Sequence, residues 1–266
     1  MTLIYHITYY PRLRSAYLQF DGCNYVCPWC IRRLTPWDHH LPDAGGLKTR
    51  RHLTLGELVE VVSGLRERGA VEAVLGGGEP TVDPELPQVV KTLAGLRVRI
   101  LTNGFSISEE LLGVLRSCPA CEVVVSVKTL DPARHLAYTG KPLGPVLANV
   151  KRLVEAGVAV KFETVLIPGL NDVEDVEEIA RYIGEVAGPD AVLIIDPLIP
   201  IPGTPWRRPA PEEVEEAHRR ASRYVKTARH GGGGPADVPL VVFPPPGGYQ
   251  GSSRSSSGPP RPHTAV

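Results

Sequence analysis

The sequence predicts an α/β fold in which a parallel sheet forms a partial (β/α)6 TIM-like barrel, followed by a disordered C-terminal tail. Three observations predict this fold. Short apolar runs alternate with amphipathic helical segments on a repeat of roughly thirty residues. The runs are almost continuously apolar, as expected for strands that are buried on both faces. The last part of the chain is instead rich in Gly, Pro and Ser.

Six strand-and-helix units account for the alternating region. Such units give a parallel sheet with right-handed crossovers. Six units are fewer than the eight of a closed barrel, so an open partial barrel is expected. A flat doubly wound sheet is the alternative that periodicity leaves open. The expected strands are residues 15–20, 71–75, 98–101, 123–127, 158–166 and 191–195.

Helices are expected between these strands. Thr54 precedes the first helix and forms a capping box with Glu57, three positions further on. Apolar residues then recur at helical spacing up to Leu65. The later helices are expected at residues 85–94, 108–116, 132–138, 143–156, 172–187 and 211–228, and residues 3–10 form an N-terminal strand or an extended arm.

Two regions divide the chain: a core domain at 1–229 and a tail at 230–266. The tail contains four consecutive glycines, three consecutive prolines and a Ser- and Pro-rich end. Such a composition buries too little apolar surface to fold, so disorder is predicted. Within the tail, Leu240 to Phe243 is the candidate for a short strand or a docking contact.

Composition excludes several classes of protein. The chain has 266 residues, with 29 Lys plus Arg against 29 Asp plus Glu, so no global basic field would attract nucleic acid or an anionic membrane. No apolar run is long enough to span a bilayer, and the N-terminus lacks a signal-peptide pattern. Five cysteines are an odd number, which argues against a secreted disulfide framework. We expect a cytoplasmic protein with no membrane partner, and the sequence gives no evidence for a nucleic-acid partner.

Three of the cysteines lie within eight residues, in the stretch Cys23-Asn-Tyr-Val-Cys27-Pro-Trp-Cys30. Thiolates packed this closely usually hold zinc or an iron–sulfur cluster. A closed structural zinc site needs four ligands, and none follows at zinc-knuckle spacing. His39 or His40 would have to complete a zinc clip. A four-iron cluster held by three cysteines instead leaves one iron free to bind a substrate.

Further motifs follow the next strands, at the edge of a parallel sheet where sites are built. Gly77-Gly78-Glu79-Pro80 and Thr102-Asn103-Gly104 are readable as ordinary turns, in which glycine permits positive φ and close backbone approach. In the stretch Ser126-Val127-Lys128, strand alternation places Ser126 and Lys128 on one face. A lysine at this position can meet a carboxylate.

The cysteine loop and the Gly77–Pro80 turn together resemble the cluster loop and the GGEP motif of radical S-adenosylmethionine (radical SAM) enzymes. The resemblance covers about residues 15–200. It implies that Cys23, Cys27 and Cys30 bind a [4Fe-4S] cluster, whose free iron chelates the amino and carboxylate groups of SAM. In that family the cluster donates an electron, a carbon–sulfur bond of SAM breaks, and the resulting 5'-deoxyadenosyl radical abstracts a hydrogen atom.

The same resemblance implies a SAM site. Glu79 would accept from the ammonium group of SAM, and Lys128 would meet its carboxylate. Trp29 would lie near the adenine, where a flat aromatic face is useful, although a buried loop anchor is an equal alternative. The implied cofactor-binding residues are Trp29, Gly77, Gly78, Glu79, Pro80, Asn103, Ser126 and Lys128.

A looser likeness points to the enzymes that activate glycyl-radical proteins, such as pyruvate formate-lyase activating enzyme. The stretch Val165–Asp172 resembles their VPGxND segment, and the regions at 35–40 and 131–140 are also similar. Ser126 stands where these enzymes often have Asp, and the histidine expected after the strand at 191–195 is missing. The implied function is an oxidoreductase of the glycyl-radical-activating type. It would use a reduced donor such as ferredoxin or flavodoxin and act on a glycyl-radical protein.

Two other functions remain open. One is a radical SAM enzyme that modifies a small molecule, RNA or a peptide. The other is a zinc-stabilised, non-catalytic binding module. Cys118 and Cys121 lie before the strand at 123–127, at the opposite edge of the sheet from the cysteine loop. A disulfide, two structural thiols or a redox-active pair are the choices for these two cysteines.

Overall fold

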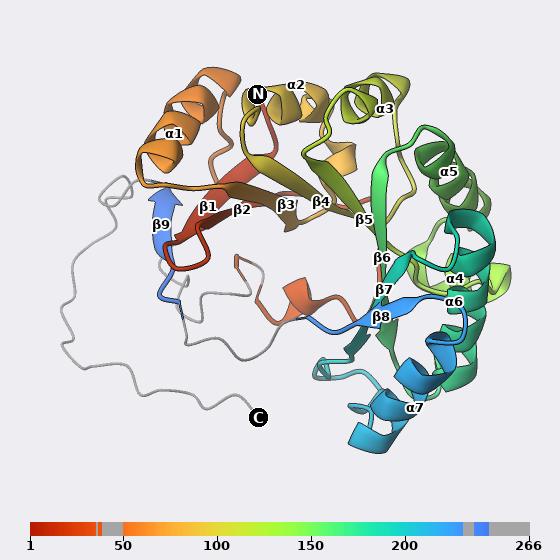
Figure 1. Ribbon diagram of the computed structural model, residues 1–266. Helices are drawn as coiled ribbons and strands as arrows, with labels where there is room; N and C mark the ends of the chain where they lie inside the picture. The colour runs from red at the N-terminus through yellow and green to blue at the C-terminus, as the bar shows by residue number, and fades with distance from the viewer. Residues whose placement is uncertain (36, 39–49, 231–236, 245–266) are drawn as a thin grey trace, which may run out of the picture.

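A single sheet organises the fold (Figure 1), and the computed structural model describes residues 1–35, 37–38, 50–230 and 237–244. The strand order in this sheet is β8-β7-β6-β5-β4-β3-β2-β1-β9. The strands are β1 (Ile4–Tyr10), β2 (Ser15–Phe20), β3 (Glu72–Gly77), β4 (Arg97–Thr102), β5 (Cys121–Ser126), β6 (Ala159–Leu166), β7 (Val192–Pro197), β8 (Lys226–Ala228) and β9 (Leu240–Phe243).

The strand order confirms the partial barrel. Strands β2 to β8 are parallel and follow one another in sequence order, whereas the strand order of a doubly wound sheet reverses at a switch point. Strand β1 pairs antiparallel with both β2 and β9, and within the described residues β8 and β9 end the sheet without joining. The sheet is therefore an open barrel, and the flat alternative is wrong.

The helices lie along the outside of the curved sheet (Figure 1), as expected when successive crossovers have the same hand. Along the chain, the helices come between successive strands of the sheet. The helices are α1 (Leu55–Glu67), α2 (Leu86–Thr92), α3 (Glu109–Arg116), α4 (Pro132–Thr139), α5 (Gly144–Glu155), α6 (Val173–Ala187) and α7 (Pro211–Ala221).

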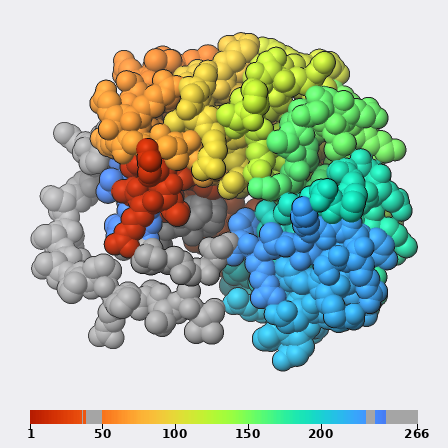
Figure 2. Space-filling view, in the orientation of Figure 1, coloured from red at the N-terminus to blue at the C-terminus, as the bar shows by residue number. Residues whose placement is uncertain are grey.

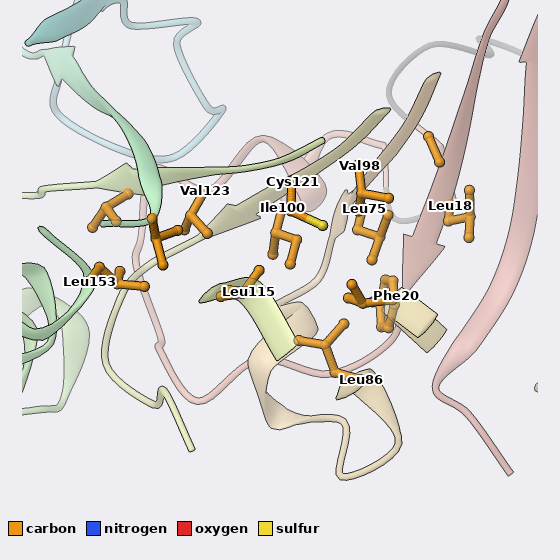
Figure 3. Packing of buried hydrophobic residues seen from close by; sticks show 14 of the residues in the cluster. Leu18, Phe20, Leu75, Leu86, Val98, Ile100, Leu115, Cys121, Val123 and Leu153 are labelled. Atoms are coloured by element: carbon orange, nitrogen blue, oxygen red, sulfur yellow. The ribbon is translucent and has the colours of Figure 1, made fainter. Parts of the chain in front are cut away.

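The main core lies between the outer face of the sheet and these helices (Figure 3). Alternate residues of each strand enter it, such as Val98 and Ile100 of β4, which are both 1% exposed. Leu111 and Leu115 of α3 meet this layer from the helix side. Burial of these apolar side chains stabilises the fold by about 25 cal/mol per Å² removed from water.

The inner face of the sheet carries polar side chains. A ladder of alternating charge crosses β3 to β6, because Arg99 pairs with Glu72 at 3.4 Å and with Glu122 at 2.8 Å, and Lys161 pairs with Glu122 at 2.8 Å. Burial opposes ionisation of Glu122, but Lys161 and Arg99 outweigh it and lower the pKa of that carboxyl. A polar inner face is suited to lining a ligand site rather than a second apolar core.

Two of the expected elements differ from the structure. The last helix ends at Ala221 instead of 228, and Lys226–Ala228 form β8 beside β7. A strand of three residues is too short to show a period, so tertiary pairing decides it; the Lys226 amide donates to the Ala191 carbonyl at 2.9 Å. At the N-terminus, the choice between a strand and an arm is settled as strand β1.

The C-terminal region contributes to the sheet. The strand expected at Leu240–Phe243 is present as β9, where Phe243 is 3% exposed. Residues 231–236 and 245–266 lie outside the described residues, so the disorder predicted there and the boundary at 229/230 stay predictions.

Cys118 and Cys121 form a disulfide that joins the end of α3 to the start of β5, as in one of the three expected alternatives. No helix in the part of the chain that the structure describes is long and apolar enough to cross a bilayer.

Candidate active site

The cysteine loop and the glycine-rich turn lie side by side. The Gly78 amide donates to the Phe20 carbonyl at 2.8 Å, and the Glu79 amide donates to the Gly22 carbonyl at 2.9 Å. These bonds continue the parallel pairing of β2 and β3 past the ends of both strands. The entry to the cysteine loop is therefore fixed by the backbone of the turn.

Close backbone approach explains the glycines of this turn. A Cβ atom on Gly78 would lie 2.2 Å from the Gly22 oxygen and 2.6 Å from the Phe20 oxygen, so no side chain fits there. Gly77 has a φ of +85°, a left-handed conformation that favours glycine. The turn and the loop can meet only because these positions have no side chain.

The Glu79 side chain is buried and points toward the end of β4. Its carboxylate accepts from the Thr102 hydroxyl at 2.7 Å, the Asn103 amide at 2.7 Å and the Thr81 hydroxyl at 2.7 Å. Burial raises the pKa of Glu79, while the bonds from Thr102, Asn103 and Thr81 oppose that rise. Donors of the protein itself therefore already bond this carboxylate, which ties β3 to β4. Its contact with the ammonium group of SAM stays a prediction.

Asn103 reaches from the end of β4 into the cysteine loop. Its Nδ2 donates to the Asn24 Oδ1 at 2.7 Å and lies 3.9 Å from the Cys23 sulfur, while its Oδ1 accepts from the Phe105 amide at 3.0 Å. The Glu79 carboxylate bonds the backbone amide of Asn103, and the Asn103 side chain bonds Asn24 of the cysteine loop. The motifs that follow β2, β3 and β4 thus form one connected network.

The three cysteines of the loop are free thiols, and Cys23 and Cys30 lie close enough to Cys27 to affect its ionisation. Burial raises the pKa of Cys27 to about 11, with Lys128 opposing the rise and Cys30 and Cys23 adding to it. Burial likewise raises the pKa of Cys23. The charge of Lys128 therefore reaches the loop and favours the thiolate, the form that binds metal, although burial outweighs it.

The three sulfur atoms of the cysteine loop do not form a trio within 4.8 Å of one another. Thiolates around one Zn²⁺ lie about 3.8 Å apart, given a Zn–S bond of about 2.3 Å. Among the described residues, the one trio of ligand atoms within 4.8 Å of one another lies elsewhere, and it does not include these cysteines. Three soft donors at wider spacing fit a multi-iron cluster. His39 and His40, the possible fourth zinc ligands, fall outside the described residues.

Trp29 anchors the loop. It is 8% exposed, and its ring lies 5.6 Å from that of Tyr138 in α4 and 5.8 Å from that of Trp206 in the segment between β7 and α7. Ile167, Leu170 and Leu198 complete this small apolar cluster. Such packing favours the loop-anchor alternative over an open face for adenine.

Helix α4 supports the other side of the loop. The Val26 amide donates to the Thr139 carbonyl at 3.1 Å, and the ring of Tyr25 lies 5.6 Å from that of His135. Burial lowers the pKa of His135. These residues of α4 belong to the region that resembles the glycyl-radical activating enzymes, and in this structure they hold the backbone that carries the cysteines.

Ser126 and Lys128 share a face, as alternation predicts. The Lys128 Nζ donates to the Ser126 Oγ at 2.7 Å, and that hydroxyl donates to the Glu163 Oε1 at 3.0 Å. Both residues lie at the same edge of the sheet as the cysteine loop. Pro80 is the first residue of a 3-10 turn and is buried.

The Val165–Asp172 segment has a structural explanation. Asn171 is 1% exposed, and its Nδ2 donates to the Val165 carbonyl at 2.7 Å. Asp172 is the N-cap of α6 and forms a capping box with Asp175. These contacts account for the Asn-Asp pair through turn and cap chemistry.

Sequence analysis missed three polar residues at this edge: Glu163, Asp196 and His230. Alternation along β6 and β7 could have identified the two carboxylates as residues of the inner face. No sequence signal could have found His230, because it follows β8 and reaches Asp196 only through the tertiary fold.

The comparisons with known proteins can be set against this geometry. The model of the family described as "Radical SAM superfamily" matches residues 17–183, more than half of the chain. The chain belongs to the radical SAM superfamily. Members of this superfamily use a [4Fe-4S] cluster and SAM, so the radical SAM chemistry and both cofactors expected from the sequence are confirmed at that level.

Curated relatives are named GTP 3',8-cyclase. The relative from Aeromonas hydrophila is 32% identical over 171 residues, which are 62% of this chain and 47% of the relative. The relative from Acidothermus cellulolyticus is 33% identical over 169 residues, 61% of this chain and 45% of the relative. The chain spans about half the length of the curated relatives it matches.

Solved radical SAM structures share the fold. Streptococcus suis SuiB bound to S-adenosylmethionine matches with a TM-score of 0.63 at 15% identity, covering 79% of this chain and 48% of SuiB. A domain of pyruvate-formate lyase-activating enzyme from Bacteroides vulgatus matches with a TM-score of 0.51 at 20% identity, covering 59% of this chain and 98% of that domain. At these identities the likeness establishes the fold alone, and it confirms the partial barrel.

Proposed function

We propose that this radical SAM enzyme holds its cluster with Cys23, Cys27 and Cys30 and binds SAM between the cysteine loop, the Gly77–Pro80 turn and Lys128. One observation carries the proposal: the turn donates two backbone hydrogen bonds to the entry of the cysteine loop, from Gly78 and Glu79. When bound, the cluster supplies the electron that splits SAM.

The chain's own residues prepare this site. Lys128 places a positive charge beside the thiols, where the carboxylate of SAM would be attracted. Glu79 and Asn103 act as positioning residues, because their bonds join β3, β4 and the loop. The packing of Trp29 and Tyr25 fixes the loop on α4, so little reorganisation would be needed when the cofactors bind.

Two substrate classes follow from different observations. Identity of about a third to GTP 3',8-cyclases favours a small molecule such as a nucleotide. Fold likeness to the activating-enzyme domain, together with the motifs at 131–140 and 165–172, supports a glycine residue of a partner protein. We place the small molecule first, because its support comes from sequence identity rather than from the fold alone. A low-potential donor such as ferredoxin or flavodoxin would supply the electron in either case.

Reductive cleavage of SAM tests the first proposal. The full chain is reconstituted anaerobically with iron and sulfide, and 5'-deoxyadenosine is measured after addition of dithionite and SAM. We expect turnover in the native chain and none in Cys30→Ala. A preparation with a full cluster and no 5'-deoxyadenosine contradicts the proposal, and zinc without iron or sulfide would select the binding-module alternative.

Substrate class is tested by hydrogen transfer. GTP and a glycine-containing loop peptide of a glycyl-radical protein are each added to the reconstituted enzyme. A true substrate raises the yield of 5'-deoxyadenosine. When that substrate is deuterated, its deuterium appears in the 5'-deoxyadenosine. Stimulation by GTP supports the nucleotide class, whereas stimulation by the peptide alone overturns that choice.

A further inference from the structure

A second group of potential metal ligands lies on the inner face of the sheet, apart from the cysteines. It consists of Glu163 in β6, Asp196 in β7 and His230 after β8. One ligand atom from each residue lies within 4.8 Å of the others, and in the described part of the chain no other trio of His, Cys, Asp or Glu does so. Three separate elements converge here, so local sequence does not explain the grouping.

The group combines two carboxylates with one imidazole. The His230 Nδ1 lies 2.8 Å and 2.7 Å from the two Asp196 oxygens, so one imidazole faces this carboxylate. Glu163 accepts from the Ser126 hydroxyl at 3.0 Å, and within residues 1–35, 37–38, 50–230 and 237–244 it has no Lys or Arg within ion-pair distance. Both carboxylates are half-buried. The Lys128 Nζ donates to the same Ser126 hydroxyl at 2.7 Å, so this positive charge lies one hydroxyl away from Glu163. The two carboxylates and the imidazole together offer two oxygen ligands and one nitrogen ligand to a single cation.

The face on which the group lies suits a ligand site. In the space-filling view, the first strands lie on the left in red, and the segment around α7 lies at the lower right in blue (Figure 2). Both ends of the core are therefore seen on one face of the molecule. Glu163 pairs in register with Ser126, and Asp196 pairs with Val165 on the neighbouring strand. The group thus adjoins Ser126 and Lys128 at the edge of the sheet where the cysteine loop begins.

We propose that Glu163, Asp196 and His230 bind one divalent transition-metal ion of the Mn²⁺ class. Carboxylate oxygens suit Mn²⁺, and an imidazole extends the choice toward Fe²⁺ and Zn²⁺. The thiols of the cysteine loop select softer partners, so the two sites would hold different metals. Three protein ligands leave coordination positions open to water or to oxygen atoms of a substrate.

Titration with Mn²⁺ tests this site without any assay of activity. The full chain carries its reconstituted cluster, is freed of other divalent ions with a chelator, and is titrated anaerobically while the free Mn²⁺ signal is followed by electron paramagnetic resonance. We expect one Mn²⁺ bound per chain. His230→Gln and Glu163→Gln should each weaken binding by roughly tenfold or more, because loss of a ligand's outer-shell partner alone costs about 10–100-fold in metal affinity.

Matched controls make the result specific. Asp190→Asn removes an exposed carboxylate that pairs with Lys226, and it should leave Mn²⁺ binding unchanged. His230 is exposed at the surface, so His230→Gln should fold, and circular dichroism verifies this. The bound Mn²⁺ should also show nitrogen hyperfine coupling that disappears in His230→Gln. No stoichiometric binding, or equal binding by the native chain and His230→Gln, overturns the proposal.

Discussion

At the scale of single residues, the absence of a Cβ atom at Gly78 allows the turn and the cysteine loop to meet. The backbone bonds between the turn and the cysteine loop bring the Gly22 and Phe20 carbonyls into the space that a Cβ would occupy. A side chain would push the loop away from the turn. The position therefore couples the stability of the sheet edge to the geometry of the cysteines.

Gly78→Ala should separate the turn from the loop. Overpacking of this kind costs about 1–3 kcal/mol, and we expect a matching loss in the free energy of unfolding together with less iron per chain after reconstitution. Gly113→Ala is the control, because nothing lies within 4 Å of its added Cβ in α3 and alanine favours a helix. Equal iron content in the two variants would contradict this account of the turn.

His135 makes the stability of the loop support depend on pH. Its Nδ1 lies 2.8 Å from the Lys141 carbonyl and therefore donates, which leaves Nε2 as the acceptor facing the Tyr25 hydroxyl at 3.4 Å. Burial lowers the pKa of His135 in the folded state, with the Lys141 carbonyl opposing the shift and Lys128 adding to it. The neutral ring is the form that the fold requires.

The direction of the effect follows from the lowered pKa. The unfolded chain binds the proton more tightly, so this contribution is present above the unfolded pKa of about 6.5 and is lost as the pH falls toward the folded value. We expect the native Tm to drop from pH 8 to pH 5.5 by more than the Tm of His135→Gln. Identical drops in the two proteins would show that His135 does not act in this way.

At the scale of elements, several helices begin where the sequence supplies a cap. Thr54 accepts from the Glu57 amide at 3.2 Å, and the Glu57 carboxylate accepts from the Thr54 amide at 2.8 Å. Ser108 caps α3, and Asp131 caps α4. These local bonds explain why the starts of α1, α3 and α4 were predictable within one or two residues.

Thr54→Ala should weaken α1 without disturbing the site. Loss of an N-cap costs about 1 kcal/mol, and Glu57→Ala should cost a similar amount. The double variant should lose less than the sum, because the two side chains bond reciprocally. Urea unfolding measures these energies. Iron content should stay at the native level, since the bonds lie within the first turn of α1; additive losses would contradict the coupling.

At the scale of the whole molecule, the barrel is held together by a core that the cysteine loop does not enter. Among the described residues, the main buried cluster runs across the outer face of the sheet and contains none of Cys23, Cys27 and Cys30. Cys27 packs only in the small clusters around Trp29 and Tyr25. Metal binding therefore should not be needed for folding.

Cys23→Ser, Cys27→Ser and Cys30→Ser combined should leave a folded, metal-free protein. We expect native far-UV circular dichroism, a cooperative thermal transition and a Tm within about 5 °C of the native value. Tryptophan fluorescence should change, because Trp29 loses a packed neighbour. A zinc-stabilised module would unfold without its metal, so an unfolded triple variant would favour that alternative.

The sequence alone determined the type of almost every element, because apolar period and cap residues are local properties. It also identified the cysteine loop and the turn at 77–80, because thiols indicate metal binding and consecutive glycines indicate close backbone approach. Only the tertiary structure decided that Glu79 faces β4, that Lys226–Ala228 join the sheet, and that His230 meets Asp196. These outcomes depend on which strand ends meet at one edge, and that is set by how the sheet curves rather than by any residue's neighbours in the chain.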